Sequence, residues 1–270
     1  MCTGTRLAGR EDGALLFHAD GRTLRRRFDF VIGADGEGST TGRLFGLEPG
    51  RRGTLRSSQA VCEGEFDPSF VEVHLGDFAR GFFAWLIPID ARHAKIGLGA
   101  VYAEDCPARL RSFIARRFPR VLMHRVVSGV IPFGSPPVRV AAGGVALVGD
   151  AAFHTKATSG GGIVFGMRSA GILAACIAHA ECPEAVPSLY TARLSAIHRE
   201  LLLHWKIRSW FNSLRDAEIN ALFARLKKAG MEEFLSQRGD MDAPSLFLPR
   251  LAVSPRFWFM ARALLSIAFA

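Results

Sequence analysis

A short apolar strand followed by a glycine-rich segment constrains this chain more than any other feature of its sequence. Val145–Val148 is a run of buried-type residues, and the segment from Gly149 to Ile163 then reads GDAAFHTKATSGGGI. The three consecutive glycines Gly160–Gly162 open a helix-like run that extends to Ala180. Glycines at such a place let a ligand approach the backbone, and the positive end of a helix stabilises negative charge there. The alternative is an ordinary strand–loop–helix with a flexible hinge.

A second segment of the same kind lies near the start of the chain. The apolar run ending in Gly33 is followed by Asp35, Gly36 and Ser39, within the sequence GADGEGS. Backbone N–H groups and a carboxylate at the end of a buried strand are typical of the sheet edge where open α/β sheets bind ligands. Asp150, leaving the later strand, offers a carboxylate that can accept hydrogen bonds from sugar-like hydroxyls. The alternative for the first segment is a plain strand followed by a helix that Ser39 caps.

The remaining sequence predicts a mixed fold of the α/β (α+β) class. Strand-like runs occur at Ala14–His18, Thr23–Ile32, Ala60–Phe66, Val71–Leu75, Phe82–Pro88 and Ala94–Val101, with one short helix at Pro107–Phe118. Beyond Cys182 the pattern is helical almost to the end. We expect residues 1–42 and 138–182 to form a partial Rossmann-like domain. Residues 43–137 are expected to form an antiparallel-sheet substrate domain, and residues 183–270 a helical C-terminal region.

Composition excludes several classes of protein. The 270 residues are 49% hydrophobic and 22% charged, which excludes intrinsic disorder. The net charge of +9 favours nucleic acid, an anionic membrane surface or a polyanionic cofactor as partner. Nucleic acid is the poorest of the three, because the basic residues lack interleaved aromatic residues. The five cysteines form no CxxC pair and no His/Cys spacing suggests a metal site, so a reducing cytoplasm fits best.

The two glycine-containing motifs together resemble one family of flavoproteins. GADG…S and GDAA…HTKATSGGGI are similar to the FAD-dependent reductases of the geranylgeranyl reductase family, within the group that includes the aromatic hydroxylases. The resemblance covers roughly Phe28 to Ala180. A third likeness is the segment Phe83–Pro88, FAWLIP, which resembles the Tyr-x-Trp-x-Phe-Pro substrate stretch of the family. Phe83 and Ile87 replace two of its aromatic residues.

The resemblance implies a site for FAD. Asp150 would hold the ribityl hydroxyls, and Gly160–Gly162 would face the pyrimidine edge of the flavin. Asp35 would lie near the phosphates, and Gly36 would permit the tight turn there. The other implied cofactor contacts are Gly149, Ala151 and Ile163.

The implied substrate pocket consists of Phe83, Trp85 and Pro88. Trp85 would line an apolar channel for an isoprenoid chain, and the alternative is that Trp85 is a plain core aromatic residue. No catalytic residue is assigned by the resemblance. His154 is the one candidate for the proton donor, against the alternative of a structural histidine.

The expected activity is FAD-dependent saturation of carbon–carbon double bonds in a polyprenyl lipid, with NAD(P)H or ferredoxin as electron donor. The alternatives are a flavin-dependent monooxygenase of the hydroxylase branch and a catalytically inactive flavin-fold module.

Two departures from the family pattern bear on the position of the flavin ring. Ala157 stands where the family usually has proline, and Phe153 where a small residue is common.

A further departure is that the chain contains no GxGxxG, the fingerprint that binds the adenosine diphosphate half of FAD. By analogy with the family, a segment carrying it belongs before Met1. We therefore expect the 270-residue chain alone to hold FAD only weakly, because charge-assisted hydrogen bonds to phosphate are each worth about 1.5–3 kcal/mol.

The C-terminal run Phe257–Ala270 is apolar except at Arg262 and is too short to span a bilayer. We expect peripheral contact of this run with the inner face of a membrane, with packing on the protein's own core as the alternative.

Overall fold

The computed structural model describes residues 2–47, 53–101, 105–137 and 139–269, which divide into two compact units. The first unit contains residues 1–52 and 134–205, and the second contains residues 53–133 and 206–270. The fold is mixed α/β with antiparallel sheets and a helical C-terminal region, which confirms the predicted fold class. The helices after residue 182, however, are divided between the two units. Helix α5 (Ser195–Asn212) begins in the first unit and ends in the second.

A three-stranded sheet forms the centre of the first unit. Its order is β10 (Ala141–Ala142), β11 (Val145–Leu147) and β4 (Val31–Gly33), and β11 pairs with β4 in parallel. All residues of β11 are buried, as expected for a strand in a parallel pair.

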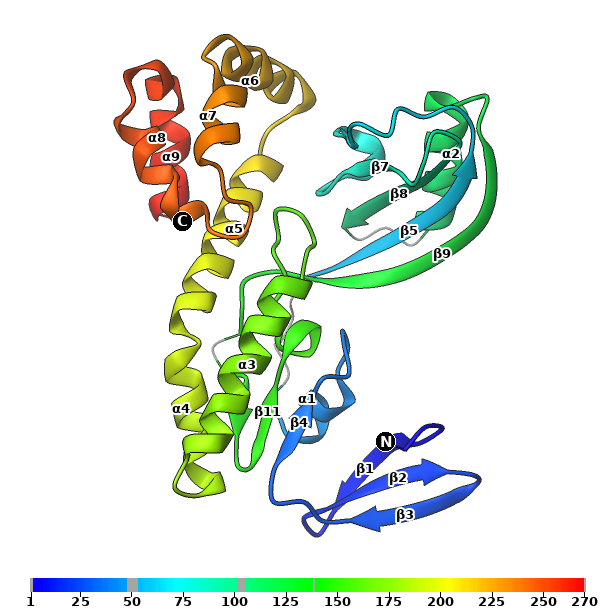
Figure 1. Ribbon diagram of the computed structural model, residues 1–270, viewed down its shortest axis with the longest axis vertical. Helices are drawn as coiled ribbons and strands as arrows, with labels where there is room; N and C mark the ends of the chain where they lie inside the picture. Colours follow the sequence, from blue (N-terminus) through cyan, green and yellow to red (C-terminus); the bar gives the residue numbers. More distant parts are fainter. Residues whose placement is uncertain (1, 48–52, 102–104, 138, 270) are drawn as a thin grey trace. The chain divides into compact units, whose positions relative to one another are not determined.

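Helices α3 (Ile163–His179) and α4 (Val186–Arg193) run beside this sheet (Figure 1). The hydroxyl of Tyr190 donates a hydrogen bond of 3.0 Å to the carbonyl of Leu147. The side chain of Tyr190 is completely buried, so this bond ties α4 to the strand inside the core.

An antiparallel meander precedes this sheet along the chain. It consists of β1 (Arg6–Glu11), β2 (Ala14–Ala19) and β3 (Arg22–Arg26). The prediction of one strand over Thr23–Ile32 is wrong, because the run is divided between β3 and β4, which belong to different sheets. β3 pairs with the neighbouring β2, whereas β4 pairs with the distant β11. Local alternation of residue types does not show where such a change of partner occurs.

A five-stranded antiparallel sheet dominates the second unit. Its order is β6 (Glu72–His74), β7 (Ala84–Pro88), β8 (His93–Val101), β5 (Gly53–Glu63) and β9 (Leu122–Phe133). Helix α2 (Cys106–Arg117) covers one face, where its Leu110 and Phe113 pack against Leu86 and Ile96. The sequence pattern predicted β6, β7, β8 and α2, whereas the strand expected at Ala60–Phe66 overlaps only the end of β5. It did not predict β9, most of whose side chains are exposed.

Helices complete the second unit. After α5 come α6 (Asp216–Lys228), α7 (Met231–Arg238), α8 (Leu248–Val253) and α9 (Ala261–Phe269). The buried guanidinium of Arg208, on α5, lies 5.2, 5.8 and 5.7 Å from the ring centroids of Phe82, Phe83 and Phe211. Burial lowers the pKa of Arg208 to about 10, which leaves the group charged at neutral pH. These cation–π contacts and a hydrogen bond from Asn212 to the Gly81 carbonyl hold the end of α5 to the sheet.

The C-terminal run is only partly α-helical. Residues Pro255–Met260 form a 3₁₀ segment before α9, and proline stands at its start, where no backbone N–H is needed. Phe257 is fully buried against Phe234, with ring centroids 5.3 Å apart. Part of this run therefore packs on the helices of its own unit, and none of the described helices is long and apolar enough to cross a bilayer.

Gly97 of β8 provides a sharp test of the five-stranded sheet. A Cβ atom at this position would overlap the indole ring of Trp85, whereas a Cβ at Gly129 of β9 would meet only the Ser57 hydroxyl, at 3.9 Å. We predict that Gly97→Ala lowers the free energy of unfolding by about 1–3 kcal/mol through overpacking. Gly129→Ala is the matched control and should change it by less than about 1 kcal/mol. Denaturant unfolding measures both, and equal stability of the two variants would contradict the packing described here.

Candidate functional site

The two glycine-containing motifs meet at one edge of the parallel strand pair in the first unit. Gly33 at the end of β4 lies opposite Leu147 at the end of β11, and the amide of Val148 donates to the Gly33 carbonyl at 3.0 Å. The loops that carry Asp35 and Asp150 therefore leave neighbouring strands at their carboxyl ends (Figure 1). Such an edge is where open α/β sheets bind ligands.

Asp35 organises the first loop through three hydrogen bonds. Its carboxylate accepts one bond from the Ser39 hydroxyl and two from Thr41, from the amide at 2.9 Å and the hydroxyl at 3.1 Å. Burial raises the pKa of Asp35, but these hydrogen bonds outweigh burial and hold the pKa below its usual value. Gly36 and Gly38 have φ of +77° and +70°, so the turn needs residues without a Cβ.

Ser39 is the N-cap of the short helix α1 (Thr40–Leu44), because its hydroxyl accepts from the amide of Gly42 at 2.9 Å. The capped-helix interpretation of this segment thus holds for Ser39. This cap leaves the strand edge free to bind a ligand, because a Cβ atom built at Gly36 would have no other atom within 4 Å.

Asp150 lies directly after β11, in the 3₁₀ turn Gly149–Ala152. One carboxylate oxygen, Oδ1, accepts a hydrogen bond of 2.9 Å from the Thr155 hydroxyl. Within the described parts of the chain, no group donates to the other oxygen. The side chain is partly exposed, and Gly149 beside it, at φ +61°, has open space at its α-carbon. Ala151, the next residue, is buried in the core.

Gly160–Gly162 form a tight connection to α3. The amide of Gly160 donates to the Lys156 carbonyl at 2.7 Å, and the amide of Lys156 donates to the Gly161 carbonyl at 3.1 Å. Gly162 is the N-cap of α3 and has no side chain to cap it. A Cβ atom at Gly162 would lie 2.7 Å from Asp150 Oδ1, so any other residue type would require the carboxylate to move. Ile163, which follows, is largely exposed.

His154 lies inside the unit rather than at the edge. Its ring is fully buried, and its Nε2 lies 3.2 Å from Nε2 of His198 on α5. Burial lowers the pKa of His154 to about 3, with His198 as a smaller cause, so the ring is neutral at physiological pH. Phe153 and Ala157, the two departures from the family pattern, are also buried. His198 escaped the sequence analysis, because no local pattern links it to His154.

The three expected substrate-pocket residues of the second unit do not share one surface. Phe83 and Trp85 are in edge-to-face contact, with ring centroids 6.0 Å apart. The indole N–H of Trp85 donates to Oε1 of Gln59 at 3.0 Å, a partner that the sequence analysis did not identify. Pro88 lies three residues further along β7, where alternation turns it to the face that α2 covers. The structure therefore brings Phe83 and Trp85 together and separates Pro88 from them.

The residues described here include no group of three or more His, Cys, Asp or Glu side chains that could hold a metal ion.

The paired strand ends, the partly exposed Asp150 and the uncapped glycine start of α3 together form the kind of edge at which open α/β sheets bind ligands. The computed structure is similar to the geranylgeranyl bacteriochlorophyll reductase-like protein of Thermoplasma acidophilum, with a TM-score of 0.77 and 19% sequence identity. That similarity covers 96% of this chain and 69% of the other. The chain resembles the geranylgeranyl reductase-like family of FAD-dependent oxidoreductases in sequence and in fold.

Two curated relatives carry the sequence similarity. The digeranylgeranylglycerophospholipid reductase of Methanothrix thermoacetophila is 28% identical over 250 residues, which are 87% of this chain and 62% of the relative. The enzyme of the same name from Methanosphaerula palustris is 30% identical over 230 residues, 79% of this chain and 57% of the relative. The chain thus spans less than two thirds of the length of either relative. A scan against protein-family models finds no match.

The buried ring of His154 makes stability depend on pH. The pKa of His154 is about 3 in the folded protein and about 6.5 in an unfolded chain. The unfolded state therefore binds this proton first, and the free energy of unfolding falls as pH drops from about 6.5 towards 3. The slope is up to about 1.4 kcal/mol per pH unit.

We predict that the wild type loses about 1 kcal/mol more stability than His154→Gln between about pH 7.5 and pH 5.5. Denaturant unfolding at both pH values measures the difference. His179→Gln, at the exposed end of α3, is the matched control and should keep the wild-type dependence. An unchanged pH dependence in His154→Gln would show that His154 is not buried as described.

Proposed function

We propose that this chain binds the flavin of an FAD-dependent reductase that saturates carbon–carbon double bonds of a polyprenyl, geranylgeranyl-type lipid. The observation that carries the proposal is the convergence of Asp150 and Gly160–Gly162 at the carboxyl edge of β4 and β11. The names of the curated relatives support the substrate class.

The residues present fit such a cofactor. Asp150 has an accessible carboxylate oxygen next to the open α-carbon face of Gly149, and Gly36 is open in the same way on the neighbouring loop. A polyhydroxylated chain can donate hydrogen bonds to Asp150, and a phosphate-bearing group can approach backbone at the glycines. When bound, the flavin supplies the hydride for the reduction.

Each protein group at this edge then has a distinct role. Asp150 holds the ribityl hydroxyls, while the bond from Thr155 fixes the direction of its carboxylate. The uncapped start of α3 stabilises negative charge on the flavin ring through its free N–H groups. Asp35, whose own hydrogen bonds are to Ser39 and Thr41, shapes the loop near the phosphates rather than binding them. His154 is structural in this proposal, because its buried and neutral ring is not at the edge.

In the second unit, Phe83 and Trp85 supply the apolar surface for the isoprenoid chain. They lie on the face of the sheet opposite α2, and Gln59 fixes the orientation of the indole.

Anaerobic incubation of the protein with FAD, a chemical reductant and a geranylgeranyl glycerophospholipid tests the activity. Products that gain two hydrogens per double bond are expected by mass spectrometry. In a parallel incubation in air, hydroxylated products in place of reduced ones would indicate the monooxygenase alternative.

Flavin affinity tests the assignment of Asp150. We predict that Asp150→Ala weakens FAD binding by at least about tenfold, because a hydrogen bond to a charged group is worth about 1.5–3 kcal/mol. Asp35→Ala should weaken binding less and lower stability more, since three hydrogen bonds end on its carboxylate. Fluorescence titration with FAD measures the affinity. Asp29→Ala, an exposed aspartate of the same unit, is the control, and equal affinity of Asp150→Ala and this control would refute the assignment.

For the C-terminal run we propose peripheral contact with an anionic membrane surface. Phe257 packs inside the protein, whereas Trp258 and Leu265 are 64% and 57% exposed. We predict that replacing both residues by serine reduces co-flotation with phosphatidylglycerol vesicles. Leu246→Ser, at a residue 62% exposed outside this run, should leave flotation unchanged. Unchanged flotation of the double variant would refute the proposed membrane contact of this run.

A further inference from the structure

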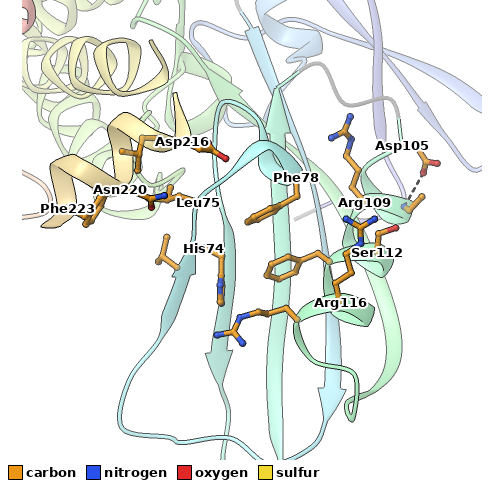
Figure 2. A pocket seen from close by; sticks show the side chains of 15 residues that line it. His74, Leu75, Phe78, Asp105, Arg109, Ser112, Arg116, Asp216, Asn220 and Phe223 are labelled. Carbon is orange, nitrogen blue, oxygen red and sulfur yellow. Dashed lines mark hydrogen bonds between the residues drawn. The ribbon is translucent and has the colours of Figure 1, made fainter. Parts of the chain in front are cut away.

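A cavity of about 850 Å³ lies on the α2 side of the five-stranded sheet, away from Trp85. Register places His74 opposite Ala84, which packs toward α2. Val73, opposite Trp85 in the register, also lines the cavity at the edge strand β6, but Phe83, Trp85 and Gln59 do not. The labelled side chains in Figure 2 come from β6 and the segment after it, from α2 and from α6. The cavity is thus separate from the surface that carries the proposed isoprenoid contacts.

One wall of the cavity is polar and positively charged. Arg109, Ser112 and Arg116 lie three and four residues apart on α2, so they share one face of that helix. The guanidinium groups of Arg109 and Arg116 form no hydrogen bond or ion pair with any residue in the described ranges. A guanidinium presents its N–H groups in a fixed fork that matches a phosphate group, and a serine hydroxyl between two guanidiniums adds a further donor.

Aromatic and aliphatic side chains form much of the remaining lining, together with Asn220. Phe78 stacks on Phe113, with ring centroids 5.0 Å apart, and His74 meets Phe113 edge-on at 5.2 Å. Phe223 of α6, 49% exposed, lines the cavity together with Ile219. The carboxylate of Glu72 lies 2.9 Å from Nε2 of His74. A positive charge on this ring would therefore be paired with Glu72 and not with a ligand.

Two acidic residues also line the cavity. Asp105 is the N-cap of α2 and accepts from the amide of Ala108 at 3.1 Å, so its carboxylate is engaged at the start of that helix. Asp216 stands at the first turn of α6. Arg109, Arg116 and Arg117 outnumber these two carboxylates, which leaves the cavity with a positive formal charge.

We propose that this cavity binds a phosphate-bearing amphiphile. The phosphate lies on Arg109, Ser112 and Arg116, and the apolar chain lies along Phe78 and Phe223. The stacked pair of Phe78 and Phe113 already uses ring faces on one another, and Asn220 is the one amide side chain among the residues that line the cavity. An aliphatic chain therefore fits better than a nucleotide. The proposal rests on the second unit alone and does not depend on flavin binding.

Dodecyl phosphate, below its micelle concentration and without FAD, is the probe for calorimetric titration. We expect saturable binding of one molecule per chain, weakened at least about tenfold by Arg109→Gln and by Arg116→Gln. Arg111→Gln is the matched control, because Arg111 is exposed on the same helix but does not line the cavity. Phe223→Ser should weaken binding as well. Inorganic phosphate and dodecyl maltoside each lack half of the recognised chemistry and should bind at least about tenfold more weakly.

The source of the phosphate is distinguished by a second arm with phosphatidylcholine vesicles, with and without phosphatidylglycerol. Loss of vesicle binding in Arg116→Gln but not in Arg111→Gln identifies a membrane phospholipid. Binding of the monomeric probe alone identifies a free phosphate ester. The proposal is overturned if Arg109→Gln and Arg116→Gln bind dodecyl phosphate as the wild type does, or if Arg111→Gln is weakened equally. It is also overturned if inorganic phosphate or AMP binds as tightly as dodecyl phosphate.

Discussion

The close approach of the Asp150 carboxylate to Gly162 determines how the start of α3 meets the end of β11 in the candidate flavin site. A Cβ at residue 162 would lie 2.7 Å from Oδ1, so the carboxylate can occupy its place only because this residue is glycine. The close approach brings the start of α3 onto the end of β11. It also sets the free N–H groups of the helix beside a negative side chain, which their partial positive charge stabilises. Thr155 completes the arrangement by donating to the same oxygen.

The rest of the first unit holds that contact in place. β11 is buried, and Tyr190 donates to the Leu147 carbonyl from inside the core. Gly166, one turn into α3, leaves room for Gly149, whose α-carbon would lie 3.4 Å from a Cβ there. The glycines of this segment therefore serve close packing at defined points, and the hydrogen bonds of Lys156 with Gly160 and Gly161 restrain the loop between them. A flexible hinge would need neither this close packing nor these hydrogen bonds.

The sequence was sufficient where the determining interactions are local. The strand at β11, the helix α3 and the helix α2 follow from apolar runs, glycine placement and periodicity over a few residues. Long-range interactions account for what could not be predicted. Thr23–Ile32 is divided between two sheets because β4 pairs with a strand more than a hundred residues away. His198 faces His154, and Arg208 lies among three phenylalanine rings, through contacts that no local pattern records.

The separation of Phe83 and Trp85 from Pro88 shows how one strand can serve two surfaces. Successive side chains of β7 point to opposite faces, so a six-residue motif read as one pocket from the sequence is divided between both. One face carries the indole of Trp85, which lies over the bare α-carbon of Gly97 and is oriented by Gln59. The other is packed by Leu110 and Phe113 of α2, and beyond that packing the helix turns two unpaired arginines into a cavity. A ligand on the α2 face therefore contacts different side chains from an isoprenoid chain lying on Trp85. Substitutions on α2 can alter binding in the cavity without changing the surface around Trp85.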